Sequence, residues 1–162
     1  MVVVGHGLRR RQLRGPVRVG GSPREIEIVQ RRFRCRACSS VLVVAPTHVL
    51  RYRLFSSVAI TWALALYGVD RRSAAEVRHR INPWRVVGAT AARGWQALRH
   101  WITAARVEAL LPVRQALNGP PRSAAASLCF ELAAMAPPAF RAESLAHQSV
   151  AGMAHALMGI TP

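Results

Sequence analysis

The amino-acid sequence predicts an α+β fold, in which a small N-terminal β-ribbon is followed by a mainly helical bundle and by C-terminal helices. Two observations predict this order. β-branched runs and polar–apolar alternation, which are typical of strands, lie in residues 1–54. Apolar residues at helical spacing and helix-capping signals follow in residues 55–117, and further helical segments occupy residues 118–162. We therefore expect three segments with these boundaries.

Short runs of strand-forming residues predict the ribbon. Residues 2–4 are three valines, and residues 16–19 form a second short run. Residues 25–29 alternate polar and apolar side chains, which suits a strand with one buried face. Residues 41–44 are wholly apolar and predict a further strand that stops at Pro46.

Three helices are expected in the middle segment. Residues 56–66 carry apolar side chains at helical spacing, and Gly68 ends this helix. The four residues from Ser73 to Glu76 form a capping box, which opens a helix that should run to about residue 81. Thr90 can cap a third helix. Its apolar stripe is formed by Trp95, Leu98, Ile102 and Ala105.

The C-terminal segment begins with a linker and is expected to be helical. Residues 118–121 are Asn-Gly-Pro-Pro, a sequence typical of a connection between elements. Residues 123–135 predict one helix, and the two prolines that follow should end it. Residues 139–158 predict another helix. Its apolar side is formed by Ala146, Val150, Met153 and Leu157.

Charge is the strongest indication of a partner. The chain contains 23 arginines, no lysine and seven acidic residues, which gives a net charge of +16. The first 54 residues hold 12 arginines and two acids, whereas the last 54 hold three arginines and two acids. Codon bias can explain the choice of arginine over lysine, but it does not explain the scarcity of acids. The arginine-rich part therefore predicts binding to a polyanion, above all double-stranded DNA.

Other classes of protein fit the sequence less well. The hydrophobic fraction of 51% argues against a disordered basic tail. The longest apolar run, residues 58–69, is shorter than the roughly 20 residues that span a bilayer, so no membrane partner is expected. Three cysteines indicate a reducing, cytoplasmic environment. Asp70 is the only aspartate and the glutamates are scattered, so we expect no enzyme.

The second and third helices of the middle segment resemble a helix-turn-helix. In this motif the second helix enters the major groove, and residues near its start contact bases. Arg93, Gln96 and Arg99 are the candidates for that role. The alternative is a three-helix bundle with a solvated basic face. Candidates for contacts to the DNA backbone are arginines from the ribbon and the first of these two helices: Arg9, Arg10, Arg11, Arg71, Arg72, Arg78 and Arg80.

A Cys-x-x-Cys pair, Cys35 and Cys38, is typical of a zinc knuckle, in which a tight turn directs two thiolates at one metal ion. A structural zinc site needs four ligands, so this pair supplies half of one. His6 and His48 are candidates for the others, but their spacing fits no standard pattern. The alternative is a vestigial or reduced pair without metal.

Taken together, these features resemble the N-terminal region of certain bacterial insertion-sequence transposases and their stand-alone relatives. The resemblance rests on the order of the elements over residues 1–108: His6-Gly7, the arginine run, the strand into Cys35-Arg36-Ala37-Cys38, and the capped helix-turn-helix. It implies a zinc ribbon in which Cys35 and Cys38 form the second knuckle. The first knuckle would precede Val2, which implies either a misplaced start or a decayed fragment. It also implies binding of transposon ends, without a catalytic domain.

We therefore expect a cytoplasmic, non-catalytic, transposase-related protein that binds DNA through a half zinc ribbon and a helix-turn-helix. Two alternatives stay open. The apolar helix at residues 139–158 can pair with a partner protein or with a second copy of the chain, which would make the chain an interaction module or a homo-oligomer. The chain can also be a degraded transposon remnant without a selected function.

Overall fold

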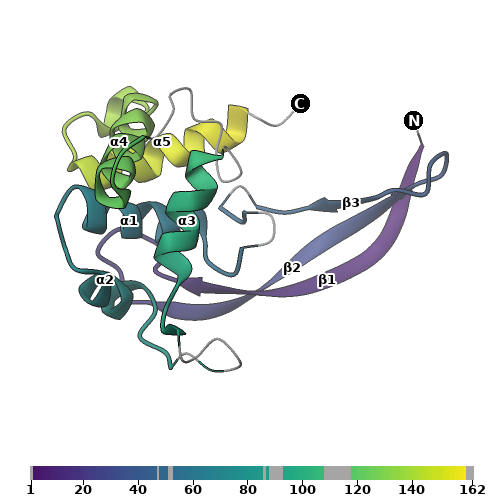
Figure 1. Ribbon diagram of the computed structural model, residues 1–162. Helices are drawn as coiled ribbons and strands as arrows, with labels where there is room; N and C mark the ends of the chain where they lie inside the picture. The colour runs from purple at the N-terminus through teal and green to yellow at the C-terminus, as the bar shows by residue number, and fades with distance from the viewer. Residues whose placement is uncertain are drawn as a thin grey trace.

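The structure is a computed structural model, and it describes residues 2–46, 48–50, 53–85, 87, 93–107 and 118–159. A three-stranded antiparallel sheet is followed by helices, so the predicted α+β class is confirmed. The helices gather at one end of the sheet, and the two long strands project beyond them (Figure 1). The zinc-ribbon and helix-turn-helix identities are treated with the site below.

The sheet has the order β1-β2-β3 and is dominated by two long strands. β1 (Val3–Gly15) pairs antiparallel with β2 (Arg24–Cys35), and β3 (Val41–Val44) pairs with the far part of β2. We call β1 and β2 the ribbon. Its far end carries the N-terminus and lies away from the helices (Figure 1).

The expectation of two short strands at residues 2–4 and 16–19 is wrong. A single strand of 13 residues replaces them, and the arginine run lies inside it. Pairing with β2 explains the difference. The backbone hydrogen bonds between the two strands continue without interruption from Leu8 to Gly15, so these residues are extended although their sequence does not alternate like that of a strand. A register shift between Gly5 and Leu8 marks a bulge, and Gly7 takes a φ of +84° there.

Helix α1 (Ser57–Gly68) packs against all four of the other α-helices, α2, α3, α4 and α5. Ser56 caps it, because its hydroxyl accepts a hydrogen bond from the Ala59 N–H at 3.1 Å. Ten of its residues are buried, since helices surround it on several sides. The predicted helix at residues 56–66 is confirmed.

Helix α2 (Ala74–Ile81) begins with the capping box that the sequence predicts. The Glu76 N–H donates to the Ser73 hydroxyl at 3.2 Å, and the Ser73 N–H donates to the Glu76 carboxylate at 2.8 Å. Two of the free backbone donors at the start of the helix are thereby satisfied. Asn82 caps the other end, which confirms the predicted stop.

Helix α3 (Ala97–Arg106) is shorter than the sequence predicts. Thr90, the predicted cap, lies outside the described residues. Gly94 has a φ of +66°, which an α-helix does not contain, so the residues just before Ala97 are not helical. Trp95 therefore precedes the helix, although it still packs edge-on against Trp101 with ring centroids 5.6 Å apart.

Helices α4 (Pro121–Ala134) and α5 (Leu145–Gly159) form the C-terminal part. The expectation of a helix from residue 139 is wrong at its start, because a 3-10 turn (Pro138–Phe140) comes first. The two helices touch very closely: a Cβ atom on Gly152 would lie 1.7 Å from the Leu132 carbonyl oxygen. Glycine is required at this crossing because any side chain would enter the backbone of α4.

One hydrophobic core joins the helices of residues 55–107 with those of residues 118–159. It contains buried side chains of α1, α3, α4 and α5. The apolar stripe predicted on α5 lies in it: Met153 is fully buried, and Ala146, Val150 and Leu157 pack around the core. This stripe is therefore used inside the chain rather than offered to a partner.

Candidate nucleic-acid interface

The ribbon sorts its arginines onto two faces. Successive side chains of a strand point to opposite sides, so residues that pair across strands share a face. Arg9 pairs with Gln30 and Arg11 pairs with Ile28. We call this side the inner face, because the buried Leu13 also belongs to it. Arg10 lies between Arg9 and Arg11 and therefore belongs to the outer face.

Acidic residues of the ribbon lie only on the outer face. Glu27 forms an ion pair with Arg10 at 3.0 Å, and Glu25 forms one with Arg14 at 2.6 Å. Both ion pairs are at the surface, so each contributes about 1 kcal/mol or less to stability. They nevertheless neutralise these two arginines. Arg10, one of the predicted DNA contacts, is thus already paired.

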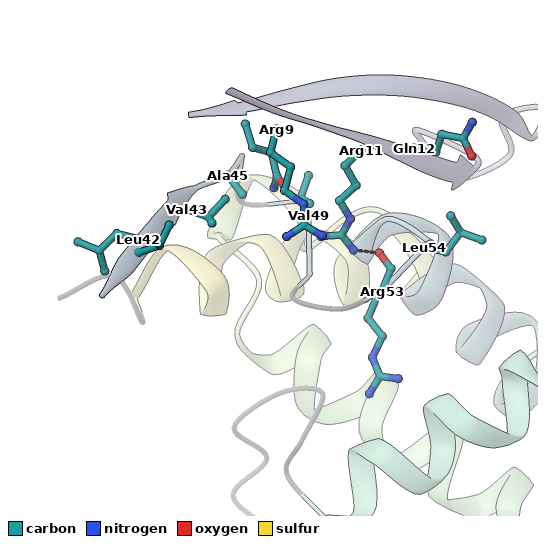
Figure 2. A pocket seen from close by; sticks show the side chains of 11 residues that line it. Arg9, Arg11, Gln12, Leu42, Val43, Ala45, Val49, Arg53 and Leu54 are labelled. Carbon is teal, nitrogen blue, oxygen red and sulfur yellow. Dashed lines mark hydrogen bonds between the residues drawn. The ribbon is translucent and has the colours of Figure 1, made fainter. Parts of the chain in front are cut away.

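The inner face carries arginines and no acid. It holds Arg9 and Arg11 on β1 and, two residues apart along β2, Arg32 and Arg34. The near part of this face covers a hollow of about 940 Å³ between the ribbon, β3 and four residues that follow β3: Ala45, Val49, Arg53 and Leu54. Figure 2 shows the side chains of Arg9 and Arg11 directed from β1 into this hollow.

Arg11 fixes the ribbon to the loop that follows β3. Its Nη2 donates a hydrogen bond to the Leu50 carbonyl oxygen at 2.9 Å and another to the Arg53 carbonyl oxygen. Burial lowers the pKa of the Arg11 guanidinium, and the positive charge of Arg9 lowers it further. Arg11 is therefore partly structural, whereas Arg9 is exposed.

Several arginines in the ribbon and just after it have side chains without a protein partner in the described part of the chain. Arg31 and Arg36 are exposed in this way, and Arg32 is half-buried. The sequence pattern did not single out these three residues as DNA contacts. The positions of the ribbon's two glutamates could have indicated them. Glu25 and Glu27 lie on the same face of β2 as Arg31, but they form ion pairs with Arg14 and Arg10 and leave Arg31 without an acidic partner.

Two of the four arginines predicted around α2 are engaged locally. Arg72 forms an ion pair with Glu76 at 3.4 Å, and Arg78 donates to the Trp84 carbonyl oxygen at 3.4 Å. Arg71 is exposed and has a φ of +57° just before the helix cap. The exposed Arg80 lies near the end of the helix.

The residues predicted to read bases do not share a helix. Arg99 lies on the exposed side of α3, but Arg93 and Gln96 precede that helix, and the Gln96 amide donates to the Arg93 carbonyl oxygen. α2 and α3 each pack against α1 rather than mainly against one another. This differs from a helix-turn-helix, whose two helices are joined by a short turn. The helix-turn-helix is therefore not confirmed.

The Cys35–Cys38 pair lies at the turn between β2 and β3. Cys35 is buried and Cys38 is exposed. Neither His6, in the bulge of β1, nor His48 joins them, since no three His, Cys, Asp or Glu residues of the described chain gather as a metal site. The described residues therefore do not fit a complete four-ligand zinc site. Zinc binding by this pair stays an untested prediction.

Comparison with known proteins finds no match: no family model, curated protein or solved structure is significantly similar to this chain. The resemblance to transposases therefore stays a prediction as well. Among the described residues, no helix is both long and apolar enough to cross a lipid bilayer.

Proposed function

We propose that this chain binds double-stranded DNA through the far half of its ribbon, which we call the arm. The observation that carries the proposal is the presence of unpaired arginines on an arm that projects from the helical body (Figure 1). Arg31 and Arg36 are both exposed there, and the ribbon's two glutamates are engaged with Arg10 and Arg14. Arginine that lacks an internal partner is available to phosphate oxygens.

The shape of the arm supports the same proposal. The major groove of duplex DNA is about 12 Å wide and admits a two-stranded antiparallel ribbon. An arm in the groove has a phosphate backbone on each side, and this arm carries arginines on both of its faces. Arg99 on the exposed side of α3 is a second proposed contact to the DNA backbone.

The proposal is tested by comparing two double variants that remove the same formal charge. R31Q/R36Q removes two unpaired arginines of the arm, and R10Q/R72Q removes two arginines that already have carboxylate partners. Binding to a 20-base-pair duplex is measured by fluorescence anisotropy at several salt concentrations. We expect R31Q/R36Q to reduce the slope of log K against log salt by about 0.9 for each phosphate that the protein no longer neutralises. R10Q/R72Q should change this slope much less.

Two results would count against this proposal. An equal reduction of slope in both double variants would mean that only net charge matters and that the arm has no special role. Equal affinity for duplex RNA of the same sequence would also contradict insertion of the arm, because the major groove of A-form RNA is too narrow and deep for side chains to read.

A further inference from the structure

The hollow beneath the ribbon combines the guanidinium groups of Arg9 and Arg11 with a lining in which none of the described residues is acidic. Arg9 and Arg11 both point into it from β1 (Figure 2). Burial lowers the pKa of the Arg11 guanidinium, and the positive charge of the nearby Arg9 lowers it further. An anionic group placed between these two side chains would relieve the repulsion between their charges.

Apolar side chains form one side of the hollow, while Gln12, Gln30 and Arg53 add further polar groups to its lining. Val41 and Val43 contribute from β3, and Val49 and Leu54 contribute from the loop after it. Val41 and Val43 are 41% and 42% exposed, although they belong to a sheet. Uncovered apolar side chains that adjoin a pair of cations fit a ligand that carries both acidic and apolar groups.

The strand beside the hollow also offers backbone hydrogen bonds. Among the described residues, β3 pairs only with β2, so its other edge is open. An exposed apolar edge strand is a site to which an extended peptide can add. The volume of about 940 Å³ is at the upper end of the range for ligand pockets, about 300–1,000 Å³, and so leaves room for a short segment of chain.

The charge and the lining argue against two other occupants. A second copy of this chain has 23 arginines and seven acids, so it would bring more positive charge to Arg9 and Arg11. A single strand of nucleic acid would find no aromatic side chain among the described residues of the lining on which to stack its bases. We propose that the hollow binds an extended segment of a partner protein in which acidic and apolar side chains alternate.

The test uses the full chain and a fluorescent ten-residue peptide of alternating glutamate and valine. Two matched peptides serve as controls: one has lysine in place of glutamate, and the other has serine in place of valine. We expect the glutamate–valine peptide to bind at least about tenfold more tightly than either control, since only it satisfies both the cations and the apolar wall.

Adjacent arginines provide matched protein variants. R9Q removes a guanidinium from the hollow, and R10Q removes one from the opposite face of the same strand. We expect R9Q to weaken binding of the glutamate–valine peptide about tenfold and V43T to weaken it to a similar degree, while R10Q leaves it nearly unchanged. Thermal unfolding of each variant establishes that the fold is kept.

Three outcomes would overturn this proposal. The first is equal weakening by R9Q and R10Q, and the second is equal affinity for the glutamate–serine peptide, because both would indicate attraction to any polyanion. The third is displacement of the peptide by duplex DNA. The arginines proposed to bind DNA lie on the arm, outside the hollow, so a peptide held in the hollow should not compete with DNA. Peptide binding by a chain that fails to bind DNA would leave this proposal standing while the DNA proposal falls.

Discussion

The guanidinium group of Arg11 and the carbonyl oxygen of Leu50 are joined by a hydrogen bond of 2.9 Å across 39 residues of sequence. The bond connects the middle of β1 with the loop that enters α1. It thereby holds β1 against the segment that leads into α1. The attachment of the ribbon depends on this charged donor as well as on the buried Leu13 nearby.

We expect R11M to destabilise the protein, because it removes the donor while keeping much of the apolar stem. Hydrogen bonds that involve a charged group contribute about 1.5–3 kcal/mol, so the free energy of unfolding should fall by about 1.5 kcal/mol. Urea denaturation measures this change. R10M is the matched control and should cost less than about 1 kcal/mol, since it removes a surface ion pair. Equal costs for both variants would show that Arg11 does not hold the loop.

The crossing of α4 and α5 gives a second prediction. G152A places a methyl group 1.7 Å from the Leu132 carbonyl oxygen, so the helices must separate. We expect the free energy of unfolding to fall by about 3 kcal/mol. G159A, at the end of the same helix, meets no atom within 4 Å and should change stability by less than about 1 kcal/mol. A G152A protein as stable as G159A would contradict the observed crossing.

The cysteines should differ sharply in reactivity. Hydrogen bonding with Ser40 lowers the pKa of the exposed Cys38 thiol, whereas burial raises the pKa of Cys129 to about 12. At pH 8 a thiol with that pKa is only about one part in ten thousand thiolate, and the thiolate is the reactive form. Iodoacetamide should therefore modify Cys38 first and Cys129 only after unfolding, as peptide mass spectrometry would show. C38S should remove the fast adduct; its persistence in that variant would contradict the assignment.

The capping box predicts a dependence of stability on pH. Hydrogen bonds from the Ser73 backbone and hydroxyl lower the pKa of Glu76, so the folded state binds this proton less readily than the unfolded state does. The stabilisation is present above the unfolded pKa, about 4.3, and is lost as the pH falls through the lower folded value. We expect the melting temperature to decline on acidification, and E76Q to show a smaller decline. A full wild-type decline in E76Q would exclude this residue as a contributor.

Local signals in the sequence predict the helices well. The capping box of Ser73 and Glu76 is visible in four consecutive residues, and the structure shows both of its hydrogen bonds. The start of α3 is different, because Thr90 looks like a suitable cap while Gly94 adopts a positive φ close to the observed helix start. Propensity alone does not reveal that backbone conformation.

The candidate site was less predictable because it depends on long-range pairing. Arg9, Arg10 and Arg11 look like one basic patch in the sequence. The strand separates them, since Arg10 meets Glu27 on one face while Arg9 and Arg11 enter the hollow on the other. Neither that alternation nor the approach of Leu50 to Arg11 follows from local sequence, because both depend on the register between distant segments.

The bulge between Gly5 and Leu8 reverses which residues of β1, odd-numbered or even-numbered, point to the inner face. On its near side, odd-numbered residues of β1 such as Arg9 and Leu13 point inward; beyond it, Val3 pairs with Cys35 and shares the outer face with Arg31. The register from Leu8 to Gly15 is anchored separately by Leu13 in its buried position. Between Gly5 and Leu8, β1 advances three residues while β2 advances two, from Phe33 to Arg31, so the bulge holds one extra residue of β1. Deletion of a single residue within the Gly5–Gly7 stretch would therefore remove the bulge while Val3 stays opposite Cys35 and Arg9 and Arg11 stay in place. The ribbon thus absorbs a change of one residue in the length of β1 without moving any side chain of β2 to the other face.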